Sequence, residues 1–236
     1  MRRALLTTSL MLVACVLAGA RSVSAQDANT FILGSATVVV PPPGGFVDVL
    51  DIIPNDHGRF ASNDLQGLLA IDVPSDILER LKTQPLMPLD IYTRVVISPQ
   101  IRERFIKPEI FAATVAEYKK NFASLTDPSG KTMTSAKTEM SLWTSQVRGR
   151  VTGINFDAPK NLGFFNESPN LLSTMILTTL KVDDRPVPML ISTSMLRVNG
   201  RLINVSIYKR SPNDKDIDVI TAFTKSWTDA IFAANK

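Results

Sequence analysis

The dipeptide Asn199-Gly200, set between two long β-rich runs, constrains the fold of this chain more than any other feature of its sequence. Both residues tolerate positive φ, and the pair is the strongest short signal for a tight β-hairpin. The run before it is Val187–Val198 and the run after it is Arg201–Lys209. A third run, Leu171–Val182, comes earlier and joins through Asp183-Asp184-Arg185-Pro186. The sequence therefore predicts a C-terminal antiparallel meander of three strands.

A closing helix is predicted over Asp214–Ala234, after Pro212 breaks the last β-rich run. Its apolar stripe follows helical spacing: Ile220, Phe223, Trp227 and Ile231. We expect Trp227 to be buried against the Val187–Lys209 hairpin, because the apolar residues that share its face must also be covered. The alternative is an exposed Trp227 that anchors a partner, since tryptophan is enriched at binding hot spots.

The first two thirds of the chain predict a mixture of strands and helices. Pro41-Pro42-Pro43-Gly44-Gly45 is expected to form a rigid turn between two strands. The expected strands are Ala36–Val40, Phe46–Ile53, Gln66–Val73 and Leu89–Ser98, and the expected helices are Ile77–Lys82, one from Pro108 to about Leu125, and one over 134–148. The two longer helices show apolar residues at helical spacing: Phe111, Val115, Tyr118, Phe122 and Leu125 in one, and Ala136, Met140, Trp143 and Val147 in the other.

The order of these elements favours an α+β fold over a doubly wound parallel sheet, because the strands come in runs and the helices do not alternate strictly with them. The sequence contains no internal repeat, no low-complexity tract and no linker long enough to divide it. We therefore predict a single α+β domain over residues 26–236. It consists of an antiparallel sheet whose C-terminal three-strand meander is packed by the closing helix and two central helices.

Segments at the two ends of this domain are similar to known proteins. Pro42-Pro43-Gly44-Gly45-Phe46, and Val198-Asn199-Gly200-Arg201 together with Trp227–Asn235, resemble segments of uncharacterised exported bacterial proteins. The order of the elements resembles the PsbP-like α+β sandwich, which photosystem extrinsic subunits share with a Ran-binding import factor. This resemblance implies a fold and no activity, and it transfers no functional residue.

Residues 1–25 have the three parts of a secretory signal peptide. Arg2-Arg3 is the positive region, Ala4–Ala20 is a mostly apolar run shorter than the ~20 residues that span a bilayer, and Val23-Ser24-Ala25 supplies the small residues of a cleavage site. We expect cleavage before Gln26 and a periplasmic or secreted protein. The alternative is a lipoprotein, because the residues that end at Cys15 resemble a bacterial lipobox.

Removal of this leader leaves a nearly neutral chain without a thiol. Three of the 26 basic residues lie in the leader and none of the 22 acidic ones does, so 23 basic residues remain against 22 acidic ones. This balance argues against a nucleic-acid binder, which needs a concentrated positive surface. Cys15 is the only cysteine, so the mature chain has no disulfide, Cys nucleophile or thiolate metal ligand. We also expect no transmembrane helix in it.

Candidate sites for chemistry are few. His57 is the only histidine and the one candidate for a general base, but it lies in a polar segment, and the sequence lacks a Gly-x-Ser-x-Gly nucleophile elbow. The usual zinc ligand sets are excluded. Two oxygen-rich groups lack the spacing of a calcium loop: Asn55, Asp56, Asn63 and Asp64, and Asp214, Asp216 and Asp218 at the start of the closing helix. We predict no catalytic, cofactor-binding or metal-binding residue.

The segment Phe164-Phe165-Asn166-Glu167 has two interpretations. The adjacent rings could line the mouth of a ligand site. The interpretation that we favour places Phe164 and Phe165 on opposite faces of a strand edge, with one ring packed and the other exposed.

These observations support a non-catalytic exported domain that binds a protein or a small ligand in the cell envelope. One alternative is a periplasmic hydrolase-type enzyme that uses carboxylates or His57. The other is a structural lipoprotein anchored in the envelope through Cys15. The sequence does not name the ligand or the partner.

Overall fold

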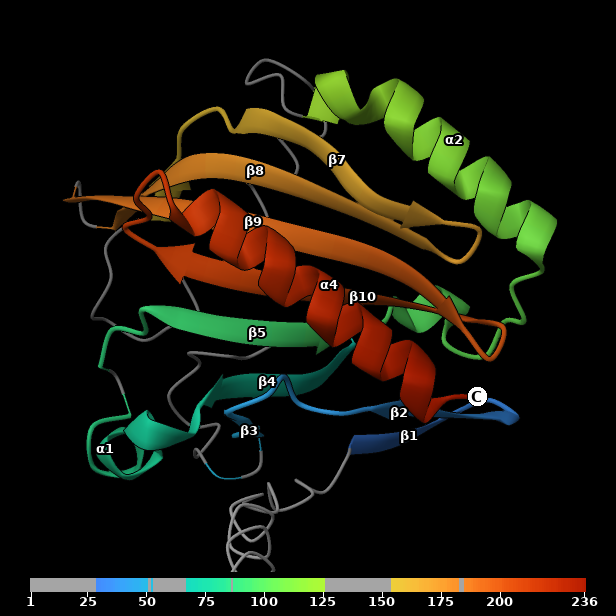
Figure 1. Ribbon diagram of the computed structural model, residues 1–236, viewed down its shortest axis with the longest axis horizontal. Coiled ribbons are helices and arrows are strands. Elements are labelled where there is room, and N and C mark those ends of the chain that lie inside the picture. Colours follow the sequence, from blue (N-terminus) through green and yellow to red (C-terminus); the bar gives the residue numbers. More distant parts are fainter. Residues whose placement is uncertain (1–28, 51, 53–66, 86, 126–153, 183–184) are drawn as a thin grey trace, which may run out of the picture.

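A computed structural model describes residues 29–50, 52, 67–85, 87–125, 154–182 and 185–236 of the chain (Figure 1). Within these ranges, eight strands form one antiparallel sheet. Its order is β3 (Phe46–Asp48), β4 (Leu68–Pro74), β5 (Ile91–Val96), β10 (Arg201–Arg210), β9 (Arg185–Val198), β8 (Leu171–Val182) and β6 (Ile154–Phe156), and β7 (Lys160–Ser168) also pairs with β8. A separate hairpin consists of β1 (Asn29–Leu33) and β2 (Ala36–Val40).

The predicted meander of β8, β9 and β10 is confirmed. Val198 pairs with Arg201 across a tight turn, and both turn residues have positive φ, 50° at Asn199 and 72° at Gly200. Leu171 pairs with Leu196 in the next ladder, so the three strands run side by side over most of their length. These long strands form the centre of the sheet, and the shorter strands β5, β4 and β3 extend it on one side.

Helix α4 (Asp216–Ala234) lies across one face of this sheet (Figure 1). Its inward residues are Ile220, Thr224, Trp227, Thr228 and Ile231. Alternate residues of the strands beneath form the main core with it: Val95, Ile97, Met175, Leu190, Leu196, Ile203, Val205 and Ile207, among others. Burial of this amount of apolar surface is the main force that holds the helix to the sheet.

Trp227 is 2 % exposed and lies in this core, which confirms the prediction of its burial. Its indole Nε1–H donates a hydrogen bond to the carbonyl oxygen of Pro41, at 2.8 Å. The polyproline turn after β2 therefore supplies the acceptor that a buried indole requires. Phe223 is only partly buried, and its ring lies 5.2 Å from that of Phe46 at the edge of the core.

The strand expected over Phe46–Ile53 is wrong in its extent, because β3 ends at Asp48. The Asp48 side chain accepts hydrogen bonds from the backbone N–H groups of Leu50 and Ile71, at 2.9 and 3.2 Å. In the first of these bonds the Asp48 side chain binds the backbone N–H two residues further along the chain. Such an Asx turn is the usual way that an aspartate ends a strand.

The shorter helices agree with the prediction in place and differ in detail. Ser75–Ile77 is a 3-10 turn that continues into α1 (Leu78–Thr83), and a second 3-10 turn forms at Pro99–Ile101. Helix α2 (Pro108–Leu125) begins at the predicted proline. The central helix expected over 134–148 and the leader over 1–25 lie outside the described residues. Within the described ranges, no helix is long and apolar enough to cross a bilayer.

Candidate interaction surface

Several predicted candidates for chemistry fall outside the part of the chain that the structure describes. These are His57 and the oxygen-rich residues around it, Asn55, Asp56, Asn63 and Asp64. The prediction that His57 takes no part in catalysis therefore stays a prediction.

The acidic residues at the start of α4 have a local role in the fold. Asp216 accepts a hydrogen bond from the backbone N–H of Asn213 at 2.7 Å, and the Asn213 side chain accepts one from the N–H of Lys215 at 2.9 Å. These bonds satisfy backbone groups at the helix start, where negative charge is also favoured by the helix dipole. Among the described residues, no three histidine, cysteine or acidic side chains gather closely enough to bind a metal ion.

Phe164 and Phe165 lie on opposite faces of β7, as the favoured interpretation predicts. Phe165 packs against the main core, whereas Phe164 is 38 % exposed and lies beneath α2. The Phe164 ring centroid is 4.8 Å from that of Phe122, and the Lys119 ammonium lies 5.7 Å above the same ring. Burial raises the pKa of the neighbouring Tyr118 hydroxyl above its usual value. This cluster attaches α2 to the sheet.

A groove of about 460 Å³ lies between α2 and the turn that joins β7 to β8. Its lining comes from Phe111, Ala112, Val115 and Ala116 on the helix and from Ser168 and Pro169 at the turn, and the Lys119–Glu167 ion pair, 2.6 Å long, also borders it. Phe164 is not among these residues, so the adjacent rings do not form its mouth. The groove offers few polar groups that could orient a ligand.

Two carboxyl groups face each other across strands β3 and β4, where Asp48 pairs with Asp72. Asp72 is 1 % exposed, and its one hydrogen bond among the described residues comes from the Thr93 hydroxyl at 2.6 Å. The pKa of Asp72 is raised to about 7: burial is the main cause, the charge of Asp48 adds to it, and the Thr93 bond acts in the opposite direction. Because the Asp72 carboxyl is covered, it does not reach a substrate in this structure.

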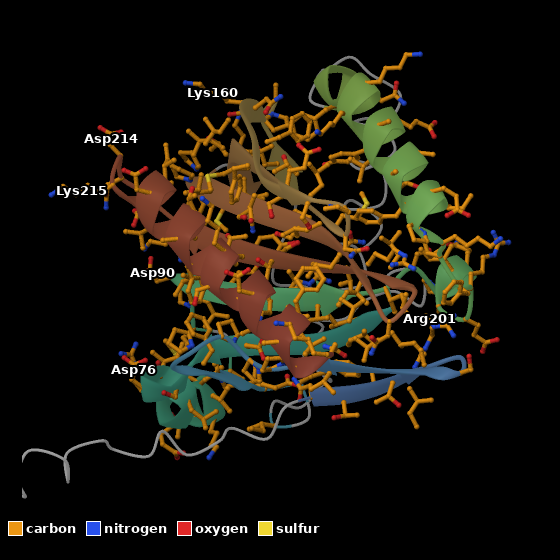
Figure 2. The ribbon with its side chains drawn as sticks, turned by 45° about the vertical axis from the view of Figure 1, so that its right-hand side comes forward. Asp76, Asp90, Lys160, Arg201, Asp214 and Lys215 are labelled. Carbon is orange, nitrogen blue, oxygen red and sulfur yellow. The ribbon has the colours of Figure 1, made fainter. Side chains whose placement is uncertain are left out.

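The loop between Pro99–Ile101 and α2 combines a fixed backbone with an exposed aromatic ring. We call it the Phe105 surface and define it as the loop 102–107 with the two turns that hold it, 34–35 and 199–200. Arg201 is buried and supports the loop from below (Figure 2). Its guanidinium donates to the carbonyl oxygen of Glu103 at 2.6 Å and to the Ser35 hydroxyl at 3.1 Å.

A second arginine holds the other end of the loop. The Arg197 Nε–H donates to the carbonyl oxygen of Ile106 at 2.6 Å, and its Nη1 donates to the Asn170 side chain at 3.1 Å. The Ile106 N–H in turn donates to the carbonyl oxygen of Gly200 at 2.7 Å. The peptide groups on both sides of Phe105 are thus fixed by charged donors, and hydrogen bonds of this kind are stronger than neutral ones.

The ring of Phe105 remains 62 % exposed between these fixed points. It rests on Gly200, where an added Cβ would lie 2.2 Å from a ring atom, so the turn needs glycine for close contact as well as for its positive φ. The Arg197 guanidinium carbon lies 5.9 Å from the ring centroid, within the range of a cation–π contact. Two more exposed apolar side chains adjoin this surface in sequence: Ile110 in the first turn of α2 and Ile32 in β1.

Positive charge predominates on the Phe105 surface. Arg102, Arg104 and Lys107 are exposed and form no ion pair with any residue that the structure describes. With the supporting arginines 197 and 201, five cations stand against two carboxylates, those of Glu103 and Glu109. The nearly neutral balance of residues 26–236 therefore hides a local positive surface around an exposed ring.

Our sequence analysis missed the Phe105 surface. A local signal exists in Arg102-Glu103-Arg104-Phe105, where an aromatic residue interrupts a charged run, and Pro108 fixes the start of the next helix. The supporting contacts could not be predicted, because Arg197 and Arg201 lie more than ninety positions further along the chain.

Comparison with known proteins places the chain in no family. No protein-family model and no curated protein matches it. The alignment with a solved structure of a variant of the protein Mog1 covers 86% of this chain and 93% of the Mog1 chain. The two sequences are 10% identical over it, and the TM-score is 0.32. The alignment with the Ran-binding protein Mog1p of Saccharomyces cerevisiae covers 87% of this chain and 90% of the Mog1p chain, at 12% identity and with a TM-score of 0.27. Likenesses of this size support no inference about this chain, and the resemblance to the PsbP-like sandwich stays a prediction.

Proposed function

We propose that this chain is an exported, non-catalytic interaction domain that binds a protein partner through the Phe105 surface. The observation that carries the proposal is an aromatic ring that is 62 % exposed while buried or half-buried arginines hold the peptide groups on both sides of it. A ring with a fixed backbone loses little conformational entropy on binding, and aromatic and arginine side chains are enriched in interfaces.

The chemistry of the described residues supports binding over catalysis. The one strongly perturbed carboxyl, Asp72, is covered, and the groove beside α2 presents one ion pair and little other polar chemistry. An enzyme needs ionisable groups that reach a common reacting atom. The hydrolase alternative therefore rests on His57 and on carboxylates that lie outside the described residues.

Site-specific photo-crosslinking in the native cell tests the proposal. A benzophenone amino acid in place of Phe105 should give a discrete crosslinked protein, because this side chain would contact the partner. The same amino acid in place of Phe164, the other exposed phenylalanine in the sheet region, is the matched control and should give none. Crosslinking at Phe164 alone would move the binding site to the surface around Phe164 and refute the proposal.

The identified partner then allows a quantitative test. Phe105→Ala should weaken its binding at least about tenfold, which is typical of an interface residue that matters, and Phe164→Ala should leave the affinity within about twofold. Equal losses in both variants would show that the ring of Phe105 has no special role.

The export half of the proposal has its own measurement. Mass spectrometry of the mature protein should find an N-terminus at Gln26, because small residues precede it at Val23 and Ala25. A lipid-modified Cys15 would instead identify the structural lipoprotein, whose partners would be restricted to the membrane surface.

A further inference from the structure

The start of α4 carries a second exposed apolar patch, with the opposite charge. We call residues 214–219 the Asp214 patch. Val219 is 59 % exposed and Ile217 is 39 % exposed, although both belong to a helix whose other face is fully covered by the sheet. Around them lie three aspartates and one lysine: Asp214, Lys215, Asp216 and Asp218. Aliphatic side chains at this exposure are unusual at the start of a helix that already has a well-packed stripe.

The Asp214 patch and the Phe105 surface lie at opposite ends of the molecule. Figure 2 shows Asp214 and Lys215 at one end and Arg201 at the other. Helix α4 connects the two ends: it has 19 residues, about 28 Å of helix, and Asn235 beyond its last turn accepts a hydrogen bond from the Asn199 side chain, next to Gly200. The Asp214 patch of one copy can therefore face the Phe105 surface of the next copy while both copies keep the same orientation.

We infer that the partner of the Phe105 surface is the Asp214 patch of a second copy of this chain, so that the protein associates head to tail. The inference rests on the proposed function and names its partner. Complementary charge is the first reason. Three exposed cations, Arg102, Arg104 and Lys107, outnumber the carboxylates of Glu103 and Glu109 at one end, and three aspartates outnumber a single lysine at the other. Exposed apolar groups on both surfaces are the second reason: Phe105 on one, and Val219 and Ile217 on the other.

The same charges disfavour a symmetric dimer. In an interface whose two-fold axis passes through the Phe105 surface, this surface would face its own copy, and the cations around Arg104 and Lys107 would repel one another. A contact between two different surfaces leaves one of each free at the ends, so association continues into short linear chains. Because the charges are exposed, the contact is expected to be weak and to depend strongly on salt, since the Debye length falls from about 10 Å at 0.1 M to about 3 Å at 1 M.

Sedimentation velocity of the full mature chain tests this inference. At low salt the weight-average mass should rise with protein concentration, and at 1 M salt it should return to that of the monomer. Phe105→Ala and Val219→Ser should each lower the association constant at least about tenfold. Lys82→Ala is the matched control, because Lys82 is an exposed cation on α1, and it should leave the association unchanged.

A charge exchange provides the decisive comparison. Arg102→Glu with Arg104→Glu reverses the Phe105 surface, and Asp214→Lys with Asp218→Lys reverses the Asp214 patch. These four residues have no hydrogen bond or ion pair among the described residues that the changes would break, and a thermal melt of each variant verifies its fold. Each double variant alone should be monomeric at low salt, because like charges then face each other. An equimolar mixture should associate again, because each variant supplies the surface that fits the other.

Association that survives both reversals, or a wild-type chain that stays monomeric at every concentration and salt, would overturn the inference. The proposed function fails separately. If Phe105 crosslinks to a different protein while the chain sediments as a monomer, the Phe105 surface is a binding surface and the second copy is not its partner. If the chain associates through other residues, Phe105→Ala leaves the association constant unchanged; the inference is then wrong, and crosslinking at Phe105 alone decides the proposed function.

Discussion

Hydrogen bonds to main-chain carbonyl groups fix the surroundings of both Trp227 and Phe105. The donor differs between the two regions, and so does the exposure of the ring. At Trp227 the ring itself donates to Pro41, and the ring is 2 % exposed. At Phe105 the supporting arginines donate to the neighbouring carbonyls, and the ring is 62 % exposed. In the first region hydrogen bonding makes burial possible, and in the second it fixes the backbone so that the ring can stay in solvent. The contacts at Trp227 thus stabilise the core, and those at Phe105 support the proposal that this ring meets a partner.

Trp227→Ala should test this comparison with the largest loss of stability. Truncation of a large buried aromatic side chain costs ~3–5 kcal/mol, a large share of the ~5–15 kcal/mol that stabilises a domain. Chemical denaturation should show a much lower midpoint, or the exported protein should fail to accumulate. Trp227→Phe is the matched control: it keeps most of the apolar surface and removes only the donor to Pro41, at a cost of about 1–3 kcal/mol. Equal losses for both variants would assign the effect to the hydrogen bond alone.

Asp72→Asn should stabilise the same region, in a way that depends on pH. The pKa of Asp72 is raised from 3.8 to about 7 in the folded chain, so the folded state holds a proton that the unfolded state loses. Below about pH 4 the carboxyl is protonated in both states and contributes no difference. Between about pH 4 and 7 its contribution to stability falls, and above about pH 7 the loss is complete, on the order of 4 kcal/mol.

Denaturation of both proteins across this pH range measures the effect. The variant should be the more stable one at pH 8, and its advantage should disappear at pH 4. Asp76→Asn, which changes an exposed carboxylate just after β4, is the control and should follow the wild-type curve. A constant difference between Asp72→Asn and the wild type at all pH values would show that the Asp72 carboxyl does not titrate in this range.

The comparison also shows which parts of this fold follow from local sequence. The meander and α4 were predictable, because the Asn199-Gly200 turn and the stripe around Trp227 depend only on near neighbours in sequence. The strand expected to continue to Ile53 was not, because its end depends on a hydrogen bond that the Asp48 side chain makes two residues on and on the position of β4. Strand β1 was missed, since its exposed Ile32 and its short length give a weak alternation.

The candidate site was beyond prediction for a related reason. The exposure of Phe105 depends on Arg197 and Arg201, and these arginines come from strands whose own pattern signals only β structure. Nothing in the charge of the whole chain indicates them, because the acidic residues elsewhere balance the total. The proposed binding surface therefore depends on contacts between distant segments, whereas the core depends mainly on periodicity.

Gly200→Ala should weaken the two regions by different amounts. A methyl group at Gly200 would lie 2.2 Å from the Phe105 ring and would sit on a backbone with φ of 72°. We expect a loss of about 1–3 kcal/mol of stability from the strained backbone, together with displacement of the ring and weaker association at the Phe105 surface. Gly44→Ala is the control, because an added Cβ there meets nothing within 4 Å and its φ is not positive. A Gly200→Ala variant that keeps its binding would show that the position of the ring is not fixed by this turn.

Phe105→Ala should have the smallest effect on stability and the largest on binding. Complete burial of a phenylalanine side chain is worth ~1.5–3 kcal/mol, and most of this ring already lies in solvent, so its removal should cost about 1 kcal/mol or less. The backbone hydrogen bonds from Arg197 and Arg201 do not involve the ring and should remain. Denaturation of Phe105→Ala should thus give nearly the wild-type midpoint, although this variant no longer binds. Trp227→Phe should show the reverse: a lower midpoint with binding retained. A loss of 3 kcal/mol or more, which is the range of a buried aromatic residue, would mean that Phe105 belongs to the core, and the distinction between the two regions would then be lost.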